Sequence, residues 1–360
     1  MALSLQNNVD QYYQEMLSLL SGLISIQSFS REEDKSADLL QDFLLDKGIR
    51  SYRKDNNVWV KNHFFDPSKP TILFNSHHDT VKPNKGYTKD PFNPEIAEDK
   101  LYGLGSNDAG GALVSLLMTF LHYYEREDLK YNLIWSGTAE EEVSGKNGVE
   151  SILKELGKIS FGIVGEPTKM EMAVAEKGLM VLDCYAKGKS GHAARDVGMN
   201  AIYKAIEDIE WIRKYRFPRV SEYLGPIKMS VTMINAGYQH NTIPDVCHYV
   251  VDIRTTDAYS NEETLDLVKE HLKAEVKERS FRLRPSYVEQ DHILVKTANE
   301  LGITMFGSPT TSDQALMPFP TIKMGPGLSE RSHSADEFIF LDELKNGPKK
   351  YIELLDKIIT

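Results

Sequence analysis

The sequence predicts an α/β fold in which a mostly parallel sheet is interrupted by a smaller inserted domain. In residues 1–177, and again in 289–360, short apolar strands alternate with helical segments, which is typical of parallel sheets covered by helices. In 178–288 the order changes to strand, helix, strand, strand, helix, strand. The length of 360 residues also exceeds one ordinary hydrophobic core, so we expect two domains with these limits.

The first part of the chain is expected to begin with two helices. Apolar residues at helical spacing mark a helix at 9–25. Ser30 with Glu33 resembles a capping box that opens a second helix, which ends at Gly48. The strand predicted at 71–75 is apolar almost throughout, as strands covered on both faces are. The other elements predicted here are strands at 58–62, 131–139 and 161–166 and helices at 109–126 and 147–156.

The inserted segment has the β-α-β-β-α-β order of a ferredoxin-like sandwich. Its predicted elements are strands at 178–187, 227–236, 246–254 and 281–288 and helices at 199–215 and 261–277. Such a sandwich leaves one sheet face or edge open, so we expect it to provide a contact between subunits. The first domain then resumes with a helix at 292–302, a strand at 320–325 and a closing helix at 341–358.

Composition argues against several classes of protein. A formal net charge of −11 disfavours nucleic acid as a partner. No apolar run approaches the roughly 18 residues of a membrane span, and the N-terminus has no export signal. The two cysteines, Cys184 and Cys247, fit reduced structural residues in a reducing compartment. We therefore expect a cytoplasmic protein with no membrane and no nucleic-acid partner.

Side chains that bind metals gather where the predicted strands end. In an open α/β sheet these ends share one edge. Each side chain alone is also explained by a polar turn or a solvated face. Several together are different, because carboxylates crowded at one edge repel one another unless a cation lies between them. They come from five separate strand ends or loops and are His77 with Asp79, Asp108, the run 140–142, Glu166 and His333.

The types of ligand indicate the metal. Carboxylate oxygens with two imidazoles, and no cysteine among them, suit zinc, manganese or cobalt. Their number exceeds the four ligands of one tetrahedral zinc, whereas two ions that share a carboxylate would use them all. Such pairs activate water for hydrolysis. The sequence therefore predicts two divalent metal ions per chain, with zinc as the first choice and cobalt or manganese as alternatives.

Sequence motifs along nearly the whole chain resemble those of one known family. In order they read "SHHDTV", "DPFNP…LYGLGSNDAGG", "AEEEVSG", "GEPT", "GKSGHA", "NTIPD…DIR" and "HSADEF". The family is that of the co-catalytic zinc aminoacylases and carboxypeptidases, which includes acetylornithine deacetylase, succinyl-diaminopimelate desuccinylase and glutamate carboxypeptidase. The resemblance implies a two-metal catalytic domain over 1–177 and 289–360 and an inserted lid and dimerisation domain over 178–288.

The resemblance also implies a role for each side chain at the strand ends. His77 and Glu166 would hold one metal, Glu142 and His333 would hold the other, and Asp108 would bridge the two.

Two further carboxylates would act beside these ligands. Asp79 would hydrogen-bond His77 and fix its tautomer. Glu141 would be the general base that takes a proton from the attacking water. A shift of one residue is the alternative, with Glu140 as base and Glu141 as ligand. The acid-Glu-Glu pattern of the family favours Glu141 as base and Glu142 as ligand.

The resemblance assigns three side chains of the inserted domain to the same site. His192 resembles a histidine that reaches across a dimer interface and stabilises the oxyanion in the partner's site, although an ordinary surface histidine is the alternative. Asn241 and Arg254 resemble substrate-binding positions, and an arginine suits a free carboxylate. A strand-end salt bridge with Asp252 or Asp257 is the other reading of Arg254.

One loop departs from the family pattern. Residues 108–111 read "DAGG" where the family has Asp-x-Lys-Gly, which keeps the ligand but removes any inference about substrate from this loop. Ser312 and Asp313 lie where the family has a Gly-Thr-Asp turn near the site.

The expected activity is removal of an acetyl or succinyl group from a small N-acyl amino acid by a homodimer. N-acylornithine, or the citrulline analogue, in arginine biosynthesis is the first choice. Succinyl-diaminopimelate desuccinylase and a metallo-dipeptidase or carboxypeptidase are the alternatives within the class. The alternative outside it is a catalytically dead protein that binds amino-acid derivatives, which the full set of ligands and the base disfavours.

Overall fold

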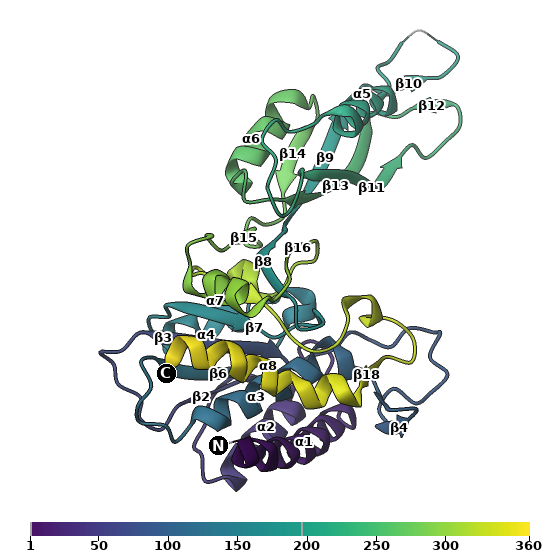
Figure 1. Cartoon of the computed structure of the whole chain (residues 1–360). Coiled ribbons are helices and arrows are strands. Elements are labelled where there is room, and N and C mark those ends of the chain that lie inside the picture. Colours follow the sequence, from purple (N-terminus) through teal and green to yellow (C-terminus); the bar gives the residue numbers. More distant parts are fainter. Residues whose placement is uncertain (1, 196) are drawn as a thin grey trace. The chain divides into compact units, whose positions relative to one another are not determined.

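The computed structural model describes residues 2–195 and 197–360, which divide into two compact units (Figure 1). The first unit extends to Val174 and resumes in Val288–Phe306 and Ser312–Thr360. The second comprises Ala175–Tyr287 and Gly307–Thr311. The last of these segments lies outside the sequence prediction of the inserted domain. None of the helices in the described residues is both long and apolar enough to cross a membrane.

A mostly parallel sheet forms the centre of the first unit, as expected for a mixed α/β fold. In sheet order its strands are β1 (Tyr52–Lys54), β2 (Asn57–Lys61), β6 (Asn132–Thr138), β3 (Thr71–His77), β7 (Phe161–Val164) and β17 (Thr321–Lys323). Strands β6, β3, β7 and β17 are parallel neighbours, whereas β1 and β2 are antiparallel. Every residue of β3 and β6 is buried, which explains their continuous apolar runs.

Six helices accompany this sheet: α1 (Ala2–Ile24), α2 (Asp34–Asp46), α3 (Gly111–Tyr123), α4 (Val149–Leu156), α7 (Ile293–Leu301) and α8 (Leu341–Ile359). Helix α3 packs against β3, α1 and α8, which places its N-terminus near the end of β3. Helix α4 packs Val149, Ile152 and Leu156 against Leu73 and Ile134 of the sheet.

A small antiparallel sheet of three strands lies in the same unit. It is formed by β18 (Phe338–Phe340), β5 (Lys100–Tyr102) and β4 (Glu95–Ala97), in that order. It holds the segment after His333 against the chain that leads to Asp108. Three short strands continue the central sheet beyond β17: β8 (Met172–Glu176) pairs with β17, and both β15 (Ser286–Tyr287) and β16 (Met305–Ser308) pair with β8.

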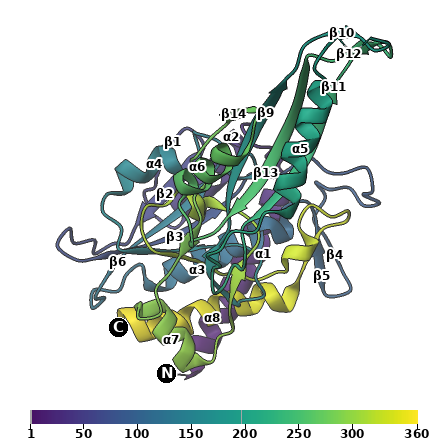
Figure 2. The ribbon, with the colours of Figure 1, turned by 90° about the horizontal axis from the view of Figure 1, so that it is seen from above.

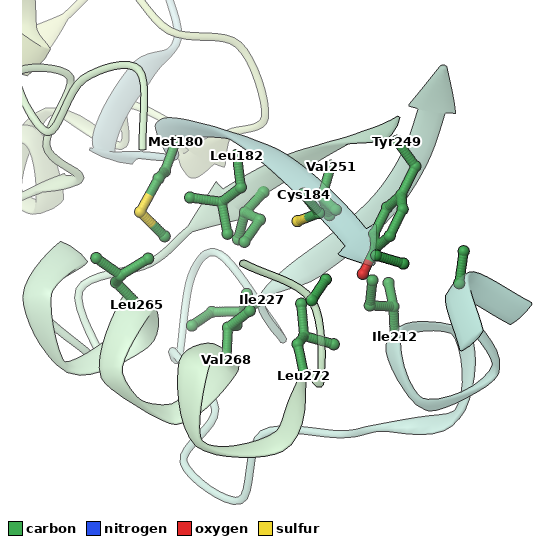
Figure 3. Packing of buried hydrophobic residues seen from close by; sticks show 14 of the residues in the cluster. Met180, Leu182, Cys184, Ile212, Ile227, Tyr249, Val251, Leu265, Val268 and Leu272 are labelled. Carbon is green, nitrogen blue, oxygen red and sulfur yellow. The ribbon is translucent and has the colours of Figure 1, made fainter. Parts of the chain in front are cut away.

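The second unit is an antiparallel sheet with two helices (Figure 2). The sheet order is β11 (Lys228–Ala236), β13 (Val246–Thr255), β9 (Gly178–Lys187) and β14 (Glu275–Glu278), and the helices are α5 (Ala201–Lys214) and α6 (Asn261–His271). Alternate residues of β9 are buried, and Met180, Leu182 and Cys184 pack toward Leu265 and Val268 of α6 (Figure 3). Strand β11 is an edge of the sheet. Strands β10 (Gly191–His192) and β12 (Thr242–Ile243) pair antiparallel as a separate two-stranded sheet.

The last helix and strand predicted in this unit were wrong in their limits. Helix α6 ends at His271 rather than 277, because the buried carboxylate of Asp208 accepts hydrogen bonds from the main-chain N–H groups of Lys273 and Ala274 and draws the chain out of the helix. The fourth strand is therefore β14, and 281–288 contains only the two residues of β15.

The predicted capping box of α2 was also wrong. The helix begins at Asp34, and no side chain caps its first turn. The Ser30 hydroxyl donates to Asp79 Oδ2 at 2.7 Å, and the Glu33 carboxylate accepts from the main-chain N–H groups of Arg31 and Glu140. Ser30 and Glu33 thus each have a distant partner, Asp79 and Glu140, and do not make the reciprocal contacts of a capping box.

Candidate metal centre

Three parallel strands end side by side and bring the predicted residues together. His77, the last residue of β3, lies opposite Thr138 of β6, and Asn75 lies opposite Val164 of β7. Glu141 and Glu142 follow β6 within a few residues, and Glu166 follows β7. Because parallel neighbours share one carboxyl edge, these side chains converge there.

Asp108 lies between the two candidate histidines. Its Oδ1 is 3.4 Å from Nε2 of His77, and its Oδ2 is 3.8 Å from Nε2 of His333. On one side, Nε2 of His77 is also 3.8 Å from Glu166 and 3.9 Å from Glu141. On the other side, Nε2 of His333 is 2.9 Å from Glu142 Oε2. This arrangement allows one carboxylate to face two cations.

The donor atoms fit divalent metals. Two overlapping groups have one ligand atom per residue, with all atoms within 4.8 Å of one another: His77, Asp108 and Glu142, and His77, Glu141 and Glu166. His333 is outside both groups but contacts Glu142 and Asp108. Oxygen donors with imidazole nitrogen are the set that zinc, cobalt and manganese accept.

The electrostatics of the cluster also favour cations. Burial raises the pKa of Glu141 well above its ordinary value, and the neighbouring charge of Glu166 adds to this. Burial would lower the pKa of His77, yet hydrogen bonds with Asp108 and Asp79 raise it well above the ordinary range. The hydrogen bond with Glu142 raises the pKa of His333 to about 9. Four carboxylates around two imidazoles therefore leave negative charge that a divalent ion would neutralise.

Asp79 contacts more than its predicted partner. Nδ1 of His77 lies 3.0 Å from the main-chain oxygen of Asp79 and 3.4 Å from its carboxylate. The same carboxylate accepts the main-chain N–H of Glu141 at 3.0 Å and that of Glu142 at 3.2 Å, and the Ser30 hydroxyl donates to it. Asp79 therefore connects the end of β3 to the turn that carries both glutamates.

Glu140 faces away from this cluster. It has a left-handed backbone with φ of 56°, and its Oε1 accepts a hydrogen bond from Asn147 Nδ2 at 2.8 Å. Gly145 packs so closely on it that a Cβ there would come within 1.8 Å of Glu140 Oε2. Glu140 thus stabilises the 140–147 turn, and the turn directs Glu141 and Glu142 toward the histidines.

His78 points to the opposite side from His77. It is buried, with Nδ1 2.8 Å from the Ser36 hydroxyl and Nε2 2.8 Å from the main-chain oxygen of Asn56. Burial lowers its pKa to about 4. A neutral imidazole therefore ties β3 to α2 and to the turn between β1 and β2.

Two buried carboxylates near the site were given no specific role by the sequence, although the family resemblance already placed Asp313 near it. Asp313 Oδ2 accepts hydrogen bonds from Asn75 and Thr138, both at 2.8 Å, and so links the ends of β3 and β6. Burial raises the pKa of Asp313 to about 6. The second is Glu337, which binds the main chain around Asp108. The motif "HSADEF" contains Glu337, but only its histidine suggested a ligand.

The three remaining candidates lie in the second unit. His192 is exposed on β10, its Nδ1 accepts from the Ala194 N–H at 3.1 Å, and its neighbour Ala193 donates its N–H to the main-chain oxygen of Asn241. Arg254 forms an ion pair with Asp252, with Nε 2.9 Å from Oδ1 and Nη2 3.2 Å from Oδ2. The salt bridge that the sequence offered as the alternative role of Arg254 is therefore present, with Asp252 as the partner.

Known proteins are similar to this chain over almost its whole length. The model of peptidase family M20/M25/M40 matches residues 73–357. A succinyl-diaminopimelate desuccinylase of Orientia tsutsugamushi is 24% identical over 94% of this chain and 95% of its own length. An acetylornithine deacetylase of Proteus mirabilis is 31% identical over 74% of this chain and 74% of its own length. The crystal structure of an aminopeptidase from Bacillus cereus shares the fold, with a TM-score of 0.78 at 19% identity over 96% of this chain and 98% of that one.

Proposed function

The chain belongs to peptidase family M20/M25/M40 and is a metal-dependent hydrolase of amide bonds, and we propose that it removes the acyl group from an N-acyl amino acid. The proposed substrate is an α-N-acetyl or α-N-succinyl derivative of ornithine, or of citrulline, in cytoplasmic arginine biosynthesis. The 31% identity to an acetylornithine deacetylase supports this choice. The comparable match to a desuccinylase keeps succinyl-diaminopimelate as the second candidate.

The observation that carries the proposal is the position of Asp108 between two imidazoles among buried carboxylates. We assign one ion to His77 and Glu166 and the other to Glu142 and His333, with Asp108 shared. Zinc is the first choice, and cobalt and manganese fit the same donors. When bound, the two ions would polarise the scissile carbonyl and make water a stronger acid.

Glu141 is the proposed general base. Its main-chain N–H is held by Asp79, and its carboxylate faces His77. It would take the proton of the attacking water and deliver it to the leaving amine. Asp79 would orient His77 and fix the turn that carries Glu141, which keeps the base at a constant distance from the ligands.

A homodimer is the proposed assembly, through the edge strand β11 of the second unit. An unpaired edge strand invites pairing with another chain. Met233 and Ile234 on β11 are 52% and 51% exposed, and Tyr203 and Ile206 on the neighbouring helix α5 are 68% and 46% exposed. Exposed apolar side chains over adjacent elements are typical of a protein contact.

In this dimer, His192 would stabilise the oxyanion in the partner's site. Asn241 and Arg254 would bind the substrate, with the Arg254 guanidinium directed at the free carboxylate.

Hydrolysis of a substrate panel by protein reconstituted with zinc, cobalt or manganese tests the function. The panel contains acetylornithine, succinylornithine, their citrulline analogues, succinyl-diaminopimelate and a dipeptide, compared by kcat/KM. We expect an acylated ornithine or citrulline to be preferred. A tenfold or greater preference for the dipeptide or the diaminopimelate derivative would overturn the substrate. Metal binding without any turnover would indicate the inactive binding protein.

A further inference from the structure

Glu337 is a buried carboxylate whose recorded partners are peptide groups of one loop. Its side chain is deeply buried, and the residue is 2% exposed. Oε1 accepts hydrogen bonds from the main-chain N–H groups of Asn107 and Asp108, both at 2.9 Å, and Oε2 accepts from that of Gly105 at 3.1 Å. Three N–H groups therefore donate to one carboxylate, and one of them belongs to Asp108, the candidate shared ligand.

The loop around Asp108 needs such an anchor because its backbone is irregular. Gly105 has φ of 76°, and Asp108 and Ala109 lie outside helical geometry just before α3 begins. The N–H groups of this stretch thus lack the regular helical partners that would otherwise satisfy them. The Asn107 side chain adds a second tie, since its Oδ1 accepts from the Leu328 N–H at 2.9 Å.

The segment that provides Glu337 also provides His333. Asn84 donates to the main-chain oxygen of His333 at 3.0 Å, and the Asp336 carboxylate accepts from the main-chain N–H groups of Thr88 and Lys89. A single short segment therefore carries one candidate ligand and holds the loop that carries another.

We propose that Glu337 is a positioning residue that sets where the Asp108 carboxylate lies between His77 and His333. The proposal rests on the two-metal site of the proposed function. An ionised carboxylate suits this position because it is an acceptor only and can receive all three N–H groups. A glutamine of the same shape would turn an NH2 group toward at least one of them and leave it without an acceptor.

Metal binding and steady-state kinetics of E337Q, E337D and D208N test the proposal. Asp208 is the matched control, because it is a buried carboxylate of the second unit that also accepts main-chain N–H groups, from Lys273 and Ala274. Affinities for zinc and cobalt are measured by titration calorimetry, and the cobalt absorption spectrum reports on coordination. Thermal unfolding with and without metal reports on stability.

We expect E337Q to lose about 10–100-fold in affinity for at least one ion, the usual effect of removing a partner behind a ligand, and to lower kcat more than KM. E337D keeps the charge and should recover part of the affinity. D208N should unfold at a lower temperature and keep the metal affinity of the original protein.

Equal metal affinity and equal kcat in E337Q and the original protein would overturn the role of Glu337, as would an equal loss of affinity in D208N. If E337Q does not fold, E337D decides, and metal affinity unchanged in E337D would also overturn it. Failure of the original protein to bind two ions would instead refute the proposed metal site.

Discussion

Glu140, Glu141 and Glu142 are consecutive in the sequence, yet their side chains have different surroundings. Glu140 binds Asn147, whereas Glu141 and Glu142 face the two imidazoles. We predict that E141Q binds both metals and loses about 10²–10⁴-fold in kcat, because it lacks the base. E142Q should weaken metal binding. E140Q is the control and should keep both metals and most of its turnover. Loss of turnover in E140Q with metals intact would shift the roles by one residue.

The two histidines lie on opposite sides of Asp108, which predicts separate losses of metal. Elemental analysis of zinc-loaded protein should approach two ions per chain. H77A and H333A should each lose one ion in preference to the other, because each removes a nitrogen donor from one side only. H78A is the control: His78 contacts Ser36 and Asn56, so this variant should lose stability and keep two ions. Saturation of the original protein at one ion would contradict the two-metal site.

The sequence predicted those site residues that a local pattern marks, and missed those whose partners are main-chain groups or distant residues. His77 stood out because it closely follows the apolar run 72–74, which marks a buried strand near its carboxyl end. Glu337 did not, because its partners are peptide N–H groups, which every residue but proline carries and no side chain marks. Ser30 was misread for a related reason: its partner Asp79 is distant in the chain, while the local pattern with Glu33 suggested a cap.

At the scale of elements, buried strands were easier to predict than short or exposed ones. Strands β3 and β6 are buried over their whole length, and their apolar runs reflect that environment directly. Strand β14 has three charged residues and one valine and is mostly exposed. Its composition therefore resembles that of the exposed face of the helix before it. The end of α6 depends on Asp208, which belongs to another helix. No local pattern records such a contact.

The second unit's sheet has a charge cluster that predicts a pH dependence of stability. Hydrogen bonds from Arg279, and also from His248, lower the pKa of Asp183 on β9 to about 2. Because this pKa lies below the ordinary value of about 3.9, the contribution to stability is complete above pH ~4 and is lost as pH falls toward 2. We expect D183N to unfold at a lower temperature than the original protein at pH 7, and the difference to shrink between pH 4 and 2.

Thermal unfolding at pH 7, 4 and 2.5 measures this effect. D257N, which changes an exposed aspartate of the same unit, is the control and should follow the original protein at every pH. If the difference in unfolding temperature between D183N and the original protein stays constant down to pH 2.5, the ionisation of Asp183 does not contribute to stability.

At the scale of the whole molecule, the proposed dimer predicts complementation between inactive variants. H192A and E141A should each be nearly inactive, because one lacks the oxyanion donor and the other the base. After subunit exchange, a mixed dimer would contain one site with both groups, so part of the activity should return. The measurement is kcat of the mixture against each variant alone.

Ile234 provides the control for this experiment. A lysine on the exposed β11 edge opposes pairing with a second chain, so adding I234K to both variants should give monomers and no recovery. Light scattering reports the assembly state. A fully active monomer of the original protein would rule out the shared site.

The pairing of β17 with β7 has a consequence for how the protein is made. Thr321 of β17 lies opposite Gly162 of β7, so a strand from late in the chain fills a place beside one from its first half. The ribosome adds about 5–20 residues per second, so β7 waits on the order of ten seconds for β17 to be synthesised. The second unit emerges in the interval and is free to fold first. Until β17 follows, the nascent chain carries an unpaired apolar strand, and we expect chaperones to bind it during this interval.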